Sequence, residues 1–279
     1  ELLQVEGEMH LYFNPHHLVF DGGSDEHLAT IYQAIQSGRE IEPAPVVPSP
    51  SPKRADWRGY FELGNLPTLL KGKPANRMEQ HWVEALDKDV VQACRLLQTH
   101  WKVSGAVVYG LLLGEALHQS GIEMPWISLV MDTRSVPSVG MHMRAFPFPT
   151  GIAWNWAERA GRGKEALRHL FEHQHANVVY PDGIGHAAFH QVGLVVQHPV
   201  NLAAGVQVGS STSRPRLPLT LYLETINENV FLRWEFDSGY FYAADLKLFA
   251  RELGIDLVMN TELEVKDGVF TGEVIHPTC

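Results

Sequence analysis

The sequence predicts a layered α/β (α+β) fold. Two observations lead to this: segments with helical periodicity alternate with short apolar segments typical of strands, and helices separate several of those strands. The 279 residues are enough for one large domain or two lobes with a self-supporting core. A hydrophobic content of 45% and a charged content of 19% are typical of a folded protein rather than a disordered one.

The first predicted elements are a strand over residues 9–13 and a helix over residues 25–37. The strand is rich in aromatic and apolar residues, and a polar turn follows it. Ser24 or Asp25 is the expected N-cap of the helix, because both residue types accept hydrogen bonds from a first helical turn. The apolar residues of this helix share one face: Leu28, Ile31, Tyr32 and Ile35.

Residues 38–55 form the clearest linker, because their five prolines favour extended backbone and exclude helix. Two helices follow, over residues 88–101 and 105–119, with apolar residues at helical spacing and Ser104 as the cap of the second. The later elements are, in chain order, a strand over 126–131, an extended segment over 139–153, a helix over 158–177, a strand over 189–198, a hairpin of 218–225 and 229–237, a helix over 243–253, and a hairpin within 261–275.

Charge and cysteine content exclude several classes of function. The net charge of −10 repels phosphate backbones, so we expect no nucleic-acid partner. No apolar run is long enough to cross a bilayer and there is no signal-peptide pattern, so we expect no membrane association and a cytoplasmic protein whose Glu1 is a trimmed start. The two cysteines, Cys94 and Cys279, lack a CxxC pattern, and Cys94 is expected to be a core thiol in a helix.

The chemically informative segment runs from His16 to Gly22, with the sequence HHLVFDG. A predicted strand end delivers His16 and His17 into a turn, and histidine is the side chain that accepts a proton near neutral pH. Asp21 follows His17 by four residues, ahead of two glycines that allow unusual backbone conformations or close approach of a ligand. The simpler alternative is a surface turn with two ordinary histidines, since the chain has 15 of them.

The other histidines predict no metal site. His173 and His175 lie two residues apart on a predicted helix and so face different ways, and no carboxylate completes a ligand set with His186 and His190. The sequence also lacks the GxSxG, P-loop and GxGxxG patterns of hydrolases, nucleotide-binding proteins and dinucleotide-binding proteins.

The His16–Gly22 segment resembles the HHxxxDG motif of the condensation-domain superfamily. This superfamily includes condensation domains of nonribosomal peptide synthetases, stand-alone acyltransferases and chloramphenicol acetyltransferase. The order of three later features is similar to the family: Ala55-Asp56-Trp57, then Arg134 shortly before Val139-Gly140, then the strands at 219–223 and 234–237. The resemblance covers roughly residues 5–255 and implies a chloramphenicol-acetyltransferase-like fold.

The motif begins at residue 16, whereas in the family it follows most of a first lobe. The resemblance therefore implies a first lobe that is largely missing, and a chain that is a fragment or one half of a two-chain assembly. The expected organisation is the end of the first lobe at 1–37, the proline-rich linker at 38–55, the second lobe at 56–255, and an unassigned tail at 256–279.

The resemblance implies an acyltransferase with His17 as the catalytic residue. His17 would take a proton from the acceptor, or orient the acceptor and stabilise the tetrahedral intermediate. Asp21 and Arg134 would pair and hold the loop, His16 would be structural, and the backbone N–H of Gly22 would contact the thioester carbonyl oxygen.

The implied donor is a phosphopantetheine thioester on a carrier protein or coenzyme A, and the protein itself would bind no cofactor or metal. The acceptor would be an amine, giving an amide or peptide bond. One alternative is a stand-alone O-acyltransferase acting on an alcohol. Another, of a different class, is a non-catalytic scaffold that binds carrier proteins.

Overall fold

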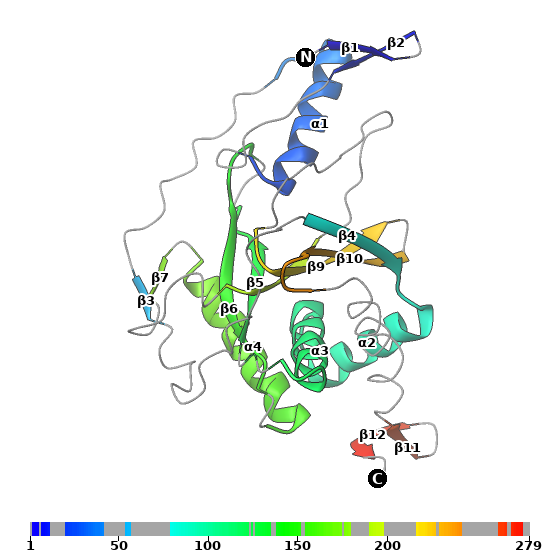
Figure 1. Ribbon diagram of the computed structural model, residues 1–279, viewed down its shortest axis with the longest axis vertical. Coiled ribbons are helices and arrows are strands. Elements are labelled where there is room, and N and C mark those ends of the chain that lie inside the picture. Colours follow the sequence, from blue (N-terminus) through cyan, green and yellow to red (C-terminus); the bar gives the residue numbers. More distant parts are fainter. Residues whose placement is uncertain are drawn as a thin grey trace. The chain divides into compact units, whose positions relative to one another are not determined.

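The structure is a computed structural model, shown in Figure 1. It describes residues 2–5, 7–11, 20–41, 54–56, 79–122, 124, 126–134, 138–151, 154–174, 176–179, 190–197, 216–226, 229–241, 262–266 and 269–275. The chain divides into two compact units. The described residues of the first unit fall within 1–49 and 132–144, and those of the second unit within 50–131, 145–200 and 210–279.

The first unit contains a small hairpin and one helix. Strands β1 (Leu2–Val5) and β2 (Glu8–Leu11) pair antiparallel, and their turn contains Gly7 at a φ of 87°, which favours glycine. Helix α1 (Gly22–Gln36) begins three residues earlier than predicted, because Asp21 is its N-cap. The prediction of Ser24 or Asp25 as the cap is therefore wrong, and Ser24 instead completes the capping box from the first turn.

The second unit is built on a mixed six-stranded sheet of order β4-β10-β9-β8-β5-β6. The strands are β4 (Glu79–Ala85), β5 (Trp126–Asp132), β6 (Met143–Pro149), β8 (Val192–Val196), β9 (Leu219–Ile226) and β10 (Asn229–Asp237). Strand β10 runs antiparallel to β4 and β9, and β8 runs parallel to β9 and β5. The sheet confirms the predicted hairpin of 218–225 and 229–237 and the strand at 126–131.

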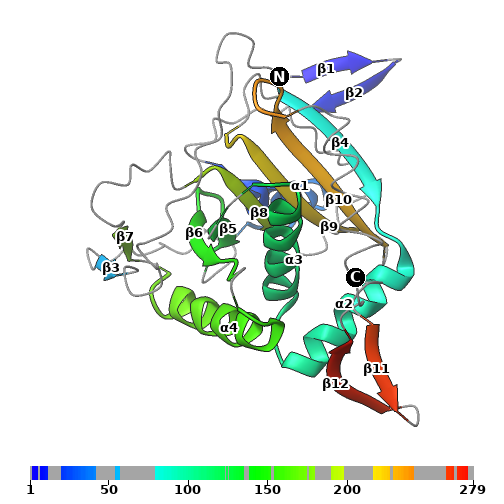
Figure 2. The same cartoon turned by 60° about the horizontal axis from the view of Figure 1, so that its bottom comes forward.

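Three helices gather on one side of this sheet: α2 (Lys88–Trp101), α3 (Gly105–Gln119) and α4 (Trp156–Glu172), as Figure 2 shows. Helix α3 packs against α2, α4 and β8. Nine of its residues are buried, so it is apolar on almost all sides. The predicted helices at 88–101 and 105–119 are confirmed, including Ser104 as the N-cap residue of α3.

Two shorter strand pairs complete the described elements. Strand β3 (Arg54–Asp56) pairs parallel with β7 (Asn177–Val179), and β11 (Glu262–Lys266) pairs antiparallel with β12 (Val269–Ile275) as the sequence predicts. Strands β1, β3, β4 and β7 were not predicted. The predicted helix at 243–253 and most of the proline-rich linker lie outside the described residues. None of the described helices combines the length and apolar character needed to cross a bilayer.

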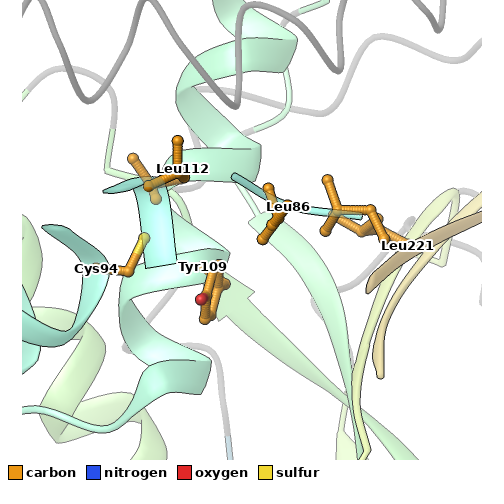
Figure 3. Close-up of a pocket in the computed structure, with 7 residues that line it drawn as sticks. Leu86, Cys94, Tyr109, Leu112 and Leu221 are labelled. Atoms are coloured by element: carbon orange, nitrogen blue, oxygen red, sulfur yellow. The ribbon is translucent and has the colours of Figure 1, made fainter. Parts of the chain in front are cut away.

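The core of the second unit contains a small cavity, shown in Figure 3. It is lined by Leu86, Val90, Cys94, Tyr109, Leu112, Leu221 and Leu232. Its volume of about 20 Å³ has room for one water molecule, far below what a substrate needs. Burial raises the pKa of the Cys94 thiol to about 11, although a hydrogen bond with Tyr109 lowers it in part. Cys94 is thus the buried core thiol that the sequence predicts, and the cavity is a packing feature.

Candidate functional site

Asp21 is the centre of the candidate site. It caps helix α1, and its Oδ1 accepts hydrogen bonds from the backbone N–H of Ser24 at 3.2 Å and from the Ser24 hydroxyl at 3.0 Å. A carboxylate is favoured here because the first N–H groups of a helix lack partners and carry partial positive charge. The side chain of Asp21 is fully buried, so every one of its lone pairs needs a donor.

Arg134 reaches Asp21 from the segment that joins the end of β5 to the start of β6. Its guanidinium forms ion pairs with the carboxylates of Asp21 and Asp132. It also donates to the backbone carbonyl of Ser138 at 2.8 Å and to that of Gly140 at 3.0 Å. This Asp21–Arg134 pair is the contact that the family resemblance implies, and it links residues 113 positions apart.

The second oxygen of Asp21 binds the backbone of the same segment. Oδ2 accepts from the N–H of His142 at 2.6 Å and from the N–H of Met143 at 2.9 Å. Burial raises the pKa of Asp21, but the bond from Arg134 and these two N–H groups outweigh burial and hold the pKa below its ordinary value of 3.8. Asp21 is therefore ionised at neutral pH and has no free lone pair with which to act as a base.

Ser24 is a site residue whose role sequence reasoning missed. Its hydroxyl oxygen accepts from Arg134 at 2.8 Å and from the backbone N–H of Gly140 at 3.0 Å. The same hydroxyl has one hydrogen, which it can donate to Asp21 or to the carbonyl of Gly140 at 2.9 Å. The serine three residues after the aspartate was visible as a capping-box pattern, but the Val139-Gly140 pair gives no sign that its backbone would complete the network.

Gly23 is required by close approach rather than by an unusual backbone angle. It lies in the first turn of α1, and a Cβ added to it would overlap the guanidinium of Arg134 and the carboxylate of Asp132. From the sequence, unusual backbone conformation or close approach of a ligand is the expected reason for these glycines. Here the group that approaches the backbone is the protein's own arginine.

Of the other predicted site residues, the structure describes Gly22 but not the two histidines. His16 and His17 lie outside the described residues. Gly22 is the first residue of α1, where a backbone N–H has no carbonyl four residues earlier within the helix. The arrangement therefore fixes the end of the HHxxxDG segment, four residues beyond His17, through one fully bonded carboxylate.

Of the two histidines considered as a metal pair at 186 and 190, only His190 is described. It is buried, and its Nδ1 lies 2.6 Å from the hydroxyl oxygen of Ser128 on β5. The contact is thus a buried hydrogen bond of the sheet.

The fold is similar to solved structures of condensation domains. The first condensation domain of the calcium-dependent antibiotic synthetase matches 93% of this chain with a TM-score of 0.65 and 18% identity, over 67% of its own length. SgcC5 from Streptomyces globisporus matches 88% of this chain, with a TM-score of 0.64, 13% identity and 67% of its length covered. VibH, a nonribosomal peptide synthetase condensation enzyme, matches 87%, with a TM-score of 0.57, 13% identity and 68% of its length covered.

No protein-family model matches the sequence, and no curated protein gives a significant match. At these identities the structural likeness establishes the fold, so the predicted fold class and the resemblance to condensation domains are confirmed at that level. The chain spans about two thirds of the length of the structures that it matches.

Proposed function

We propose that this protein is a condensation-type acyltransferase. It takes an acyl group from a phosphopantetheine thioester on a carrier protein and transfers it to an amine, which gives an amide or peptide bond. The protein binds no cofactor or metal for this step. Its support is the condensation-domain fold together with the HHxxxDG segment.

The observation that carries the proposal is the network around Asp21. A surface turn with two ordinary histidines has no need for a buried carboxylate four residues later, bound by an arginine, a serine and two backbone N–H groups. Such a network resists motion, because moving Asp21 would strand a buried charge. It holds the end of the motif in one place, as a catalytic turn requires.

In this proposal His17 acts on the acceptor. It takes a proton from the attacking nitrogen, a role that contributes about 10²–10⁴-fold in rate, or it orients a neutral amine and stabilises the tetrahedral intermediate. The N–H of Gly22 binds the developing oxyanion, since the first turn of a helix offers unpaired donors and favours negative charge.

Transfer to an alcohol is the second candidate, and one observation favours it. The structure of SgcC5 contains a naphthyl ethanediol, so the same fold accommodates a hydroxyl compound. The chemistry at His17 would be unchanged, because a hydroxyl presents a proton to the same imidazole. A scaffold that binds carrier proteins without turnover is the third candidate.

The test is a transfer assay with the purified protein, an acyl carrier thioester, and amine or alcohol acceptors in parallel. We expect product with the amine, and its loss in His17→Ala with the melting temperature unchanged. His118→Ala, a histidine on α3, is the control and keeps its turnover. Undiminished turnover in His17→Ala would eliminate the assignment, ester formation alone would select the second candidate, and carrier binding without turnover would select the scaffold.

A further inference from the structure

The last turn of α4 brings three metal-ligating side chains together. His169, Glu172 and His173 are spaced at i, i+3 and i+4, so they share one face at the end of the helix. One ligand atom from each lies within 4.8 Å of the others, and the two imidazole rings are 4.2 Å apart at an angle of 35°. The expectation of no metal site came from the spacing of His173 and His175, whereas the partner of His173 in this group is His169, four residues earlier.

A hydrogen bond orients one of the imidazoles as a ligand. Nδ1 of His173 lies 3.0 Å from the backbone carbonyl oxygen of His169. A carbonyl only accepts, so Nδ1 carries the hydrogen, and Nε2 keeps the lone pair that a metal needs. Histidines that bind metals are commonly held by such a bond from their other nitrogen.

The charges around the group suit a cation. The group lies at the C-terminal end of α4, where the aligned backbone dipoles of the helix leave partial negative charge. Glu172 adds a carboxylate, which now pairs with Arg168 at 2.7 Å. Both of these side chains are exposed, at 67% for Arg168 and 49% for Glu172, so the pair is weak and the carboxylate can turn to an ion that arrives from solvent.

We propose that His169, Glu172 and His173 bind a divalent transition-metal ion, with Zn²⁺ as the best fit. Two imidazole nitrogens and one carboxylate oxygen form a common zinc set with one position left for water, whereas Ca²⁺ and Mg²⁺ take oxygen ligands. Zinc–ligand bonds of about 2.0–2.2 Å place the ligand atoms of one ion within about 4 Å of one another, and rotation of the exposed Glu172 side chain can bring its carboxylate to that distance.

The test is a titration of untagged, chelator-treated protein with ZnCl₂ by calorimetry, and with Co²⁺ by visible absorption. We expect one tight equivalent of Zn²⁺ and a tetrahedral Co²⁺ spectrum. His169→Gln and His173→Gln should each weaken this binding more than about tenfold, since even the loss of a group that only hydrogen-bonds to a metal ligand costs about that much. His100→Gln is the matched control, a histidine in the last turn of α2 with no histidine three or four residues away.

Arg168→Gln gives an independent check that does not remove a ligand. It releases Glu172 from its ion pair, so we expect tighter zinc binding with the helix intact by circular dichroism. The proposal is overturned if the wild-type protein binds no Zn²⁺ up to about 1 mM. It is equally overturned if the His169→Gln/His173→Gln double variant binds Zn²⁺ with the same affinity and stoichiometry as the wild type.

Discussion

Among the described residues, each of the two units contains one nearly buried arginine, and the two are bonded in different ways. Arg134, with its side chain 9% exposed, lies against two carboxylates, a hydroxyl and two backbone carbonyls. Arg159, with its side chain 2% exposed, pairs with the carboxylate of Glu115 at 2.6 Å and donates to the carbonyls of Thr150 and Leu111. Its guanidinium also lies over the ring of Trp156, 4.1 Å from the centroid.

The difference lies in what each partner can do once the arginine is gone. Glu115 is 19% exposed and can turn toward water, whereas the side chain of Asp21 is fully buried and also caps a helix. The network of Arg134 is therefore the more brittle one, because none of its central charge can be solvated. Arg159 joins α4 to α3 and is a packing device, whereas Arg134 holds the end of the candidate catalytic turn.

The largest expected effect is that of Asp21→Asn. An amide nitrogen would face Arg134 or the N–H groups of His142 and Met143, so we expect a loss of about 3–5 kcal/mol in the free energy of unfolding, along with activity. Urea unfolding measures it. The control is Asp132→Asn, whose carboxylate is 34% exposed and whose loss should cost about 1 kcal/mol or less. Equal losses of unfolding free energy for the two variants would contradict the claim that the buried charge of Asp21 is the more sensitive part of the network.

The same carboxylate predicts a dependence on acid. The folded pKa of Asp21 is lowered, so its contribution to stability is complete above the pKa of the unfolded chain and is lost as the pH falls through the folded value. Unfolding curves recorded from about pH 5 down to about pH 2 should therefore fall more steeply for the wild type than for Asp21→Asn. Parallel curves would show that Asp21 does not titrate in this way.

A smaller effect is expected for Arg159→Met, which keeps the apolar stem over Trp156 and removes the charge. Because Glu115 can reach solvent, we expect a loss of about 2 kcal/mol in thermal or chemical unfolding. Arg162→Met is the comparison, since Arg162 lies over the ring of Trp154 on the exposed side and should contribute about 0.5–1 kcal/mol. If Arg159→Met lost as much unfolding free energy as Asp21→Asn, the two arginine networks would not differ in the way described.

Effects of opposite sign are expected from two helical glycines. Gly23→Ala pushes a methyl group into Arg134 and Asp132, and should destabilise by about 1–3 kcal/mol. Gly161→Ala, on α4, meets nothing within 4 Å and should stabilise by about 0.5–1 kcal/mol. Melting temperatures of the pair measure both, and two shifts of the same sign would refute the close approach at Gly23.

The sequence predicts elements best where burial is one-sided. Residues 88–101 show their buried face in the spacing of Val90, Cys94 and Leu97, and the structure has the same helix. Strand β4 was not predicted, because it is an edge strand with Val83 exposed and lacks a clear hydrophobic pattern. Its pairing with β10 holds it in the sheet. The stacking of its Trp82 on Trp234, with ring centroids 6.5 Å apart, depends on a residue 152 positions away and leaves no local signal.

The candidate site, too, was predicted only in part. The pairing of Asp21 with Arg134 followed from the family resemblance, but the capping role of Asp21 did not, because Ser24 and Asp25 are equally good caps by residue type. Asp21 is favoured as the cap because the backbone N–H groups of His142 and Met143, more than a hundred residues later, also bind its carboxylate. Every residue except proline has a backbone N–H, so residue types do not reveal which N–H groups will meet Asp21. This part of the network could not be predicted from the sequence.

The buried thiol of Cys94 can be used to measure local opening of the core of the second unit. With a pKa of about 11, only about one thiol in 10⁴ is a thiolate at pH 7, and the side chain is fully buried. Maleimides and disulfide reagents should therefore label Cys94 only when helix α2 opens away from the core. The rate of that labelling, followed by peptide mass, gives the opening rate of this helix without any engineered probe.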